Sequence, residues 1–211
     1  MKFYDCPPAP SPRRVRIFIA EKGLLDKIEI VPVDLRGGAH MKPDFERINP
    51  FRTVPALELD DGTCISESIA CCRYLEAAFP EPPLMGRTPK EQGVIAMWEH
   101  RCEWDGFIGG AEMLRNTAPG FKNRALTGPV VIDQIPQLAE RGRKRIAWFH
   151  EFLEKRLGET DYVGGDEYSV ADITALISVD FAARQKAGIP ESHTNLKRWY
   201  DQIAARPSSK L

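Results

Sequence analysis

The sequence lacks a long apolar run, and it has no excess of either charge. Its uncharged apolar stretches are short, such as residues 173–179, whereas a membrane-spanning helix needs about 20 apolar residues. The 29 basic and 30 acidic residues give a net charge of −1, so no basic stripe is available for nucleic acid. The first residues, MKFYDCPP, contain no apolar segment of the kind found in secretory signals. We therefore expect a cytoplasmic protein that binds neither membranes nor nucleic acid, although Ser209-Lys210-Leu211 match a peroxisomal address.

The sequence also lacks any cysteine spacing that fits a disulfide framework or a zinc site, and its five cysteines are an odd number. The cysteines form no C-x-x-C pair and have no histidines at ligand spacing. They are Cys6, Cys64, Cys71, Cys72 and Cys102. We expect no disulfide scaffold and no metal, and we expect Cys71 and Cys72, which lie in a helical pattern, to pack in the core.

What remains is the composition of an ordinary globular protein, with 43% hydrophobic and 28% charged residues in 211. This composition excludes disordered and low-complexity classes. A chain of this mass buries about 70% of its surface on folding, which is enough for one large domain or two small ones.

The first eighty residues alternate strand and helix patterns. The expected elements are strands at 2–5, 28–33, 54–59 and 63–65 and helices at 11–23 and 66–79. The first strand, helix and second strand predict a right-handed parallel crossover. The last two strands, joined by Asp60-Asp61-Gly62, predict a hairpin added to that sheet.

The segment Pro80-Glu81-Pro82-Pro83 ends this alternation, because proline cannot continue a helix. We therefore predict an α/β domain at 1–80, a linker at 81–87 and an all-helical domain at 88–211. Helical patterns in the second domain cover 89–115, 134–157, 169–187 and 194–205, with a loop at 116–133. Ser169 and Asp172 have the spacing of a capping box, which we expect to start a core helix rather than to carry chemistry.

The first candidate for chemistry is Ser11, which is followed by Pro12. We expect Ser11 to be the N-cap of a helix and Pro12 to be its first residue. A hydroxyl at a helix N-terminus can also stabilise a bound anion, together with the free N–H groups and the helix dipole. The residues alone leave both interpretations open.

Two other segments could hold a peptide-like ligand. Pro55 begins a strand, which suits an edge position or a cis bond and leaves the backbone of Val54 free to pair with an extended ligand. Glu67 and Ser68 follow Ser66 at a helix start. Either Ser66 only caps the helix, or Glu67 binds an ammonium group while Ser68 and the helix N–H groups bind a carboxylate.

Together these segments resemble the cytosolic glutathione transferases over nearly the whole chain. Several motifs of that family occur in the right order. They are Ser11-Pro12-Arg13-Arg14-Val15-Arg16 with Ala20-Glu21-Lys22-Gly23, Asn49-Pro50 with Val54-Pro55-Ala56-Leu57, Asp61-Gly62 with Glu67-Ser68 and Arg73-Tyr74-Leu75-Glu76, and Gly165 with Ser169-Val170-Ala171-Asp172. The resemblance implies a thioredoxin-like N-terminal domain, an all-helical C-terminal domain, glutathione as co-substrate and a homodimer.

The resemblance also implies where glutathione binds. Val54, preceding a cis Pro55, would hold the cysteinyl part through its backbone, and Glu67 and Ser68 would hold the γ-glutamyl part.

Two basic residues resemble the family's contacts to the glycine carboxylate. They are His40 and Arg52. The loop that carries His40 varies within the family, and a solvated loop histidine is the alternative interpretation.

The residue that activates the thiol is where this chain differs from several branches of the family. Alignment on Arg14-Val15-Arg16 places Ala9 at the catalytic serine of the theta, delta and zeta branches and at the cysteine of the omega branch. The same alignment places Ser11 where the beta branch has a cysteine. Ser11 is therefore the expected catalytic residue.

Two neighbouring residues are weaker candidates. Alignment on Pro7 places Asp5, rather than Tyr4, at the tyrosine of the alpha, mu and pi branches, and one position along a strand points to the other face. Cys6 could be a nucleophile that makes mixed disulfides, or a small buried side chain.

The resemblance thus implies a glutathione transferase whose thiolate attacks a hydrophobic electrophile in a cleft beside the helical domain. Trp104, Phe107 and Met113 on the first long helix could line that pocket, and core packing is the competing interpretation for each. Two other classes stay open: a glutathione-dependent thiol-disulfide oxidoreductase and a non-catalytic glutathione-binding module. The helices expected to line the pocket follow no motif, so the sequence does not identify the electrophile.

Overall fold

The proline-rich segment at 80–83 separates two units, which the computed structural model describes over all residues, 1–211. The first unit comprises Met1–Pro82 with Thr127–Val130 and Leu211, and the second comprises Pro83–Leu126 and Val131–Lys210. Residues 127–130, expected in the loop of the helical domain, thus group with the first unit. None of the helices has the length and apolar character that crossing a bilayer would require.

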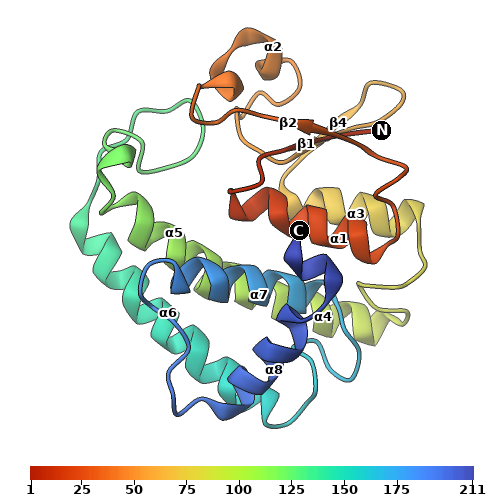
Figure 1. The fold of residues 1–211 in the computed structure, drawn as a ribbon, viewed down its shortest axis with the longest axis vertical. Helices are drawn as coiled ribbons and strands as arrows, with labels where there is room; N and C mark the ends of the chain where they lie inside the picture. Colours follow the sequence, from red (N-terminus) through yellow and green to blue (C-terminus); the bar gives the residue numbers. More distant parts are fainter. The chain divides into compact units, whose positions relative to one another are not determined.

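A four-stranded mixed sheet forms the centre of the first unit (Figure 1). Its strands are β1 (Lys2–Asp5), β2 (Glu29–Pro32), β3 (Ala56–Glu58) and β4 (Cys64–Ser66), in the order β2-β1-β3-β4. β1 and β2 are parallel, while β3 is antiparallel to both β1 and β4. The predicted parallel crossover and hairpin are therefore confirmed. β1 has the predicted bounds, β2 and β3 are shorter than the sequence pattern indicated, and β4 is shifted by one residue.

Helices cover both faces of this sheet (Figure 1). α1 (Pro10–Glu21) and α3 (Ser68–Ala78) lie side by side on one face. The 3₁₀ turn η1 (Ala39–Met41) and α2 (Pro43–Glu46) lie on the other, where the ring of Phe45 packs edge-on against Tyr4 at 5.9 Å. The sequence predicted neither of these two elements, because a single turn carries no periodic apolar pattern.

A buried lysine joins the end of α1 to the end of α3. Nζ of Lys22 donates to the carbonyls of Phe79, Pro80 and Pro82 at 2.9, 3.3 and 2.6 Å. It also lies 2.5 Å from the carboxylate of Glu76, and its side chain is fully buried. One ammonium group thus accounts for three backbone carbonyls between the end of α3 and the proline-rich segment.

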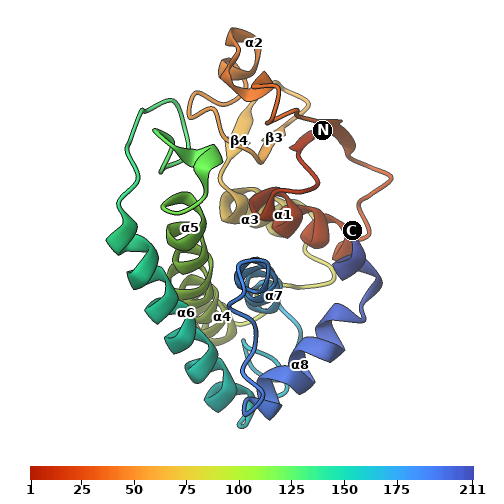
Figure 2. The ribbon, with the colours of Figure 1, turned by 60° about the vertical axis from the view of Figure 1, so that its left-hand side comes forward.

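The second unit is all helical, as predicted. Its helices are α4 (Pro89–Arg101), α5 (Ile108–Arg115), α6 (Pro136–Leu157), α7 (Val170–Ala183) and α8 (Thr194–Ala204), with 3₁₀ turns η3 (Pro119–Phe121) and η4 (Pro207–Lys210). Figure 2 shows α7 nearly end-on in the middle of this unit, surrounded by the other helices. Nearly all side chains of α7 are buried, so this helix is the core of the unit.

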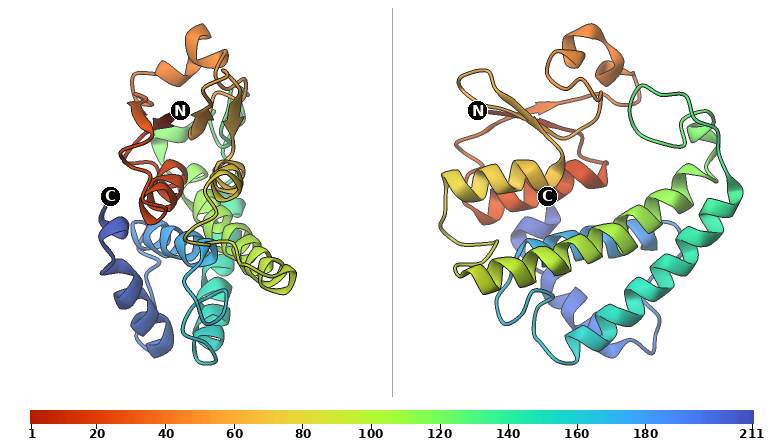
Figure 3. Two further views of the ribbon diagram at one scale, coloured as in Figure 1. Left: turned by 90° about the vertical axis from the view of Figure 1, so that its right-hand side faces the viewer. Right: turned by 180° about the vertical axis from the view of Figure 1, so that it is seen from behind.

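The single helix predicted at 89–115 is interrupted. Residues Cys102–Phe107 form a π-helical segment, η2, between α4 and α5, although the ribbon runs continuously from one helix to the other (Figure 3, right). Beyond it, α5 and α6 approach so closely that a Cβ on Gly142 would lie 2.5 Å from the carbonyl oxygen of Gly109. The apolar periodicity of the sequence could not predict this π-helical segment, because a turn with one extra residue needs no residue types other than those of an ordinary α-helix.

The predicted capping box starts α7. One carboxylate oxygen of Asp172 accepts hydrogen bonds from Val163 N and Trp199 Nε1 at 2.9 and 2.8 Å, and the other accepts from Ser169 N and Oγ at 3.0 and 3.1 Å. Asp172 is fully buried, and burial raises its pKa to about 6. The geometry agrees with the structural role predicted for it.

Candidate functional site

Ser11 lies in the first turn of α1, but it is not the N-cap. The helix begins at Pro10, and its N-cap is Ala9, whose backbone is extended. The prediction chose the wrong proline of two: Pro10 rather than Pro12 occupies the first helical position, and a residue before a proline favours the extended conformation that Ala9 adopts. The partly buried Ser11 hydroxyl makes no hydrogen bond to another protein group, so it is available to a ligand.

Three segments meet at one end of the sheet. Ala56 pairs with Tyr4 on one side and with Ser66 on the other. Continuing this register places Val54-Pro55 beside Glu67 and beside the loop that leaves β1. The three glutathione-site segments expected from the sequence are therefore neighbours.

Val54 lies outside the strand ladder, because β3 begins at Ala56. The Val54–Pro55 bond is cis, as expected. Asn49, fully buried, shapes the preceding turn: its Nδ2 donates to the carbonyl and hydroxyl oxygens of Thr53 at 2.8 and 3.0 Å, and its Oδ1 accepts from Phe51 N at 3.1 Å. The Asn49-Pro50 motif does not by itself reveal this turn, which depends on contacts of the Asn49 side chain.

The N-terminus of α3 is joined to that of α1. Ser68 is buried, and its hydroxyl donates to the carbonyl oxygen of Ser11 at 3.0 Å. Glu67 is the N-cap of α3, with a φ of 70°, and its side chain is exposed. Ser66, considered as a cap, instead ends β4. Two helix N-termini, each a source of partial positive charge, thus converge beside Val54. Pro10 and Pro12 have no N–H group, so in the first turn of α1 Ser11 supplies the free N–H.

The two basic candidates lie in the segments before β3. His40 is buried in η1. Arg52 has a φ of 53° and pairs with Glu46 of α2 at 2.7 Å. A carboxylate partner offsets part of the charge that Arg52 could offer to a ligand carboxylate.

The hydroxyl of Tyr4 is committed elsewhere. It donates to Glu58 at 2.5 Å on the face of the sheet that α2 covers. Burial, together with this carboxylate, raises the pKa of Tyr4 well above its usual value.

The cysteines of α3 are core residues, as predicted. Cys71 and Cys72 are fully buried. Burial, and the charge of Glu67 after it, raise the pKa of Cys71 to about 12, so its thiol stays protonated at neutral pH. Cys6 lies in the turn after β1 and is half-buried.

The three residues suggested for the electrophile pocket have different surroundings within the helical unit. Trp104 is half exposed, with the guanidinium of Arg145 at 5.0 Å from its ring. Phe107 instead packs on Phe181 of α7 at 5.5 Å. Met113 is buried among the side chains between α5, α6 and α7. Core packing thus accounts for Phe107 and Met113, and a shared pocket for the three residues stays a prediction.

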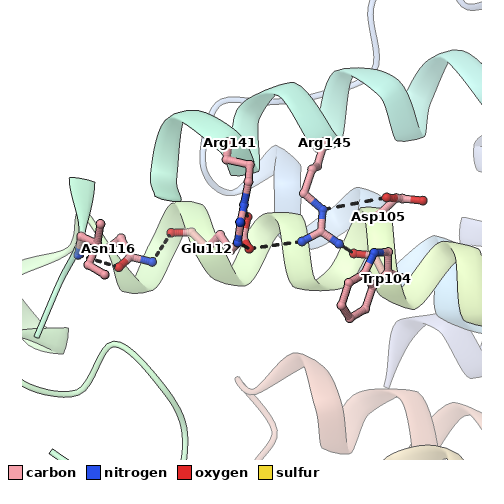
Figure 4. A network of polar contacts seen from close by, with 7 residues as sticks. Trp104, Asp105, Glu112, Asn116, Arg141 and Arg145 are labelled. Atoms are coloured by element: carbon pink, nitrogen blue, oxygen red, sulfur yellow. Dashed lines mark hydrogen bonds and ion pairs between the residues drawn. The ribbon is translucent and has the colours of Figure 1, made fainter. Parts of the chain in front are cut away.

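A charged network explains the setting of Trp104 (Figure 4). Arg145 of α6 donates to the Trp104 carbonyl, and it pairs with Glu112 at 3.2 Å and with Asp105 at 3.9 Å. Arg141 also pairs with Glu112. These contacts tie the π-helical segment to α6.

The chain is similar to known proteins over nearly its whole length. Residues 9–78 match the family model for the glutathione S-transferase N-terminal domain, and residues 123–207 match that for the C-terminal domain. The chain is 38% identical over 211 residues to glutathione S-transferase 2 of Saccharomyces cerevisiae, covering 100% of this chain and 88% of that protein.

Solved structures give the same picture. A glutathione S-transferase domain-containing protein of Marinobacter aquaeolei VT8 superposes with a TM-score of 0.91 at 40% identity, with 99% of both chains covered. Gtt2 from Saccharomyces cerevisiae has a TM-score of 0.89 at 39% identity, covering 100% of this chain and 99% of the other.

Proposed function

The chain belongs to the glutathione S-transferase family, and we propose that it activates the thiol of glutathione through Ser11. The observation that carries this proposal is the convergence of the α1 and α3 N-termini through the Ser68–Ser11 hydrogen bond of 3.0 Å. The unpartnered hydroxyl of Ser11 lies at that convergence, beside the segment that precedes β3.

The chemistry required is a lowered thiol pKa. A free thiol has a pKa near 8.5 and is only a few per cent ionised at neutral pH. Lowering the pKa by two units, about 2.7 kcal/mol, makes the thiolate the main species. Ser11 contributes a hydrogen bond to the sulfur, and the helix N-terminus contributes partial positive charge. The serine takes up no proton, and the thiolate attacks a hydrophobic electrophile.

The glutathione site proposed here follows the sheet register. The backbone of Val54, before Pro55, pairs with the cysteinyl part, which is a short form of β-augmentation. Glu67 accepts the γ-glutamyl ammonium, and the Ser68 N–H group binds its carboxylate. The Ser68 hydroxyl would have to leave the Ser11 carbonyl to donate to that carboxylate as well. We propose that His40 and Arg52 bind the glycine carboxylate of glutathione. The cytoplasmic location of the protein stays a prediction.

Replacing Ser11 with alanine is expected to lower kcat/KM for conjugation of chlorodinitrobenzene about a hundredfold, since one donor to fixed negative charge is lost. The midpoint of the pH–rate profile should also rise. Because Ser11 is not the N-cap, the variant should fold like the parent.

Cys6→Ser is the matched control and should leave conjugation unchanged. An active Ser11→Ala together with an inactive Cys6→Ser would transfer the chemistry to Cys6 and the protein to the thiol-disulfide oxidoreductases. Glutathione binding with neither conjugation nor disulfide reduction would indicate a binding module.

Glutathione should raise the melting temperature, because a ligand that binds only the folded state adds about 2.7 kcal/mol at a hundredfold excess over Kd. Glu67→Ala and Ser68→Ala should reduce this shift in a thermal-melt titration. Glu29→Ala is the control, since β2 lies at the opposite edge of the sheet from β4. Parental shifts in both α3 variants would rule out the γ-glutamyl assignment.

The chain is expected to form a closed two-fold dimer, the commonest soluble assembly. Light scattering should give about 48 kDa, twice the 23.8 kDa of one chain. A mass near that of a single chain at assay concentrations would count against the dimer.

A further inference from the structure

One buried guanidinium anchors the loop between β1 and α1. Nη1 of Arg16 donates to both carboxylate oxygens of Asp5, at 2.6 and 2.5 Å, and Nη2 donates to the carbonyl of Pro7 at 3.3 Å. The side chains of Arg16 and Asp5 are only 10% and 2% exposed. A single side chain therefore joins the end of the strand, the loop and the helix.

Stability alone is a poor reason for this arrangement. Desolvating two charges offsets most of their attraction, and well-packed apolar replacements of buried ion pairs are often as stable. A guanidinium adds geometry instead, because its planar fork fixes the directions of several hydrogen bonds at once. Helical side chains lean toward the N-terminus of their helix, so Arg16 reaches back to the loop that immediately precedes the first turn of α1.

That first turn carries Ser11. We propose that Arg16 is a positioning residue for the thiol-activating end of α1, an inference that rests on the role proposed for Ser11. By holding Asp5 and the Pro7 carbonyl together, Arg16 gives the first turn of α1 one position relative to the end of β1. Activating groups must be held to within about 0.5 Å, so a loosened loop weakens the hydrogen bond from Ser11 to the sulfur.

Two variants separate positioning from stability. Arg16→Lys keeps the charge but loses the fork, and the double variant Asp5→Leu/Arg16→Met removes both charges together, leaving neither buried alone. Both are expected to fold, with kcat/KM lowered about ten- to a hundredfold and the pH–rate midpoint raised. KM for glutathione should change much less, because Val54, Glu67 and Ser68 are untouched.

Arg47→Lys is the control, since Arg47 forms an exposed pair with Asp44 of α2 and should give parental kinetics. A folded double variant with parental kcat and pH midpoint would show that the Arg16–Asp5 pair is only structural. If the double variant does not fold, Arg16→Lys alone decides by the same two readouts. If Ser11→Ala loses activity while the Arg16 variants keep parental kinetics, only this inference is overturned. If Ser11→Ala stays active, the proposed mechanism itself is overturned.

Discussion

Replacing Lys22 with methionine is expected to lower the free energy of unfolding by about 3–5 kcal/mol, the usual cost of removing one partner from a buried ion pair. Methionine fills a similar volume, so the effect comes from the groups left behind. These are the Glu76 carboxylate and the carbonyls of Phe79, Pro80 and Pro82, which all lose the ammonium group. Denaturant unfolding measures the loss, which is a large fraction of the 5–15 kcal/mol typical of whole domains.

Lys27→Met provides the control for this experiment. Lys27 is exposed and lies over the ring of Phe79 at 5.9 Å. The Lys27→Met substitution therefore removes an equivalent charge close to Lys22 without leaving buried groups unpaired. Its effect should stay within about 0.5 kcal/mol. A Lys22→Met variant that loses less than about 1 kcal/mol would mean that water or a rearranged chain satisfies the three carbonyls.

Asp172→Ala is expected to cost about 3 kcal/mol or more, because Val163 N, Ser169 N and Trp199 Nε1 are left in the core without an acceptor. The cost should depend on pH. The raised pKa of Asp172, about 6 against an ordinary value near 3.9, means that its contribution is fully present below about pH 4 and declines as pH rises through 6. The loss in Asp172→Ala should therefore be about 1 kcal/mol larger at pH 5 than at pH 7.

Denaturant titrations at the two pH values measure this difference. Asp172→Asn keeps one acceptor for Val163 and Trp199 but points an amide group at Ser169 N, so we expect a smaller loss with little dependence on pH. Asp166→Ala, an exposed residue of the same loop, is the surface control. Equal losses at pH 5 and pH 7 in Asp172→Ala would contradict the raised pKa.

The sequence predicted elements with a long pattern and missed those without one. The apolar period of α6 and α8 and the β-branched pattern around β2 placed these elements to within a few residues. η1 and α2 are single turns, which no period can reveal. The start of α1 failed for a different reason, since Pro10 and Pro12 both suit a first turn and only the backbone of Ala9 decides between them.

The candidate site was predictable where it depends on strand pairing. A hairpin brings the residues before its first strand beside the residues after its second, so the predicted hairpin accounts for Val54 and Glu67 lying at the same end of the sheet. The Arg16–Asp5 contact depends instead on how α1 is rotated about its axis, which the sequence pattern does not specify. The same holds for the Ser68–Ser11 hydrogen bond, which requires two helices to lie side by side.

The π-helical segment between α4 and α5 also sets a rotational phase. An α-helix advances about 100° per residue, so one additional residue in a turn rotates everything after it by about that angle. Gly109 and Gly110 thereby face Arg145 of α6 and Phe181 of α7, where a Cβ on either glycine would lie within 3.2 Å of a neighbouring side chain. The apolar stripe of α4 and that of α5 are consequently out of step with each other, although both helices contact α6 and α7. The two halves of what the sequence presents as one helix therefore meet the same neighbours with differently rotated faces.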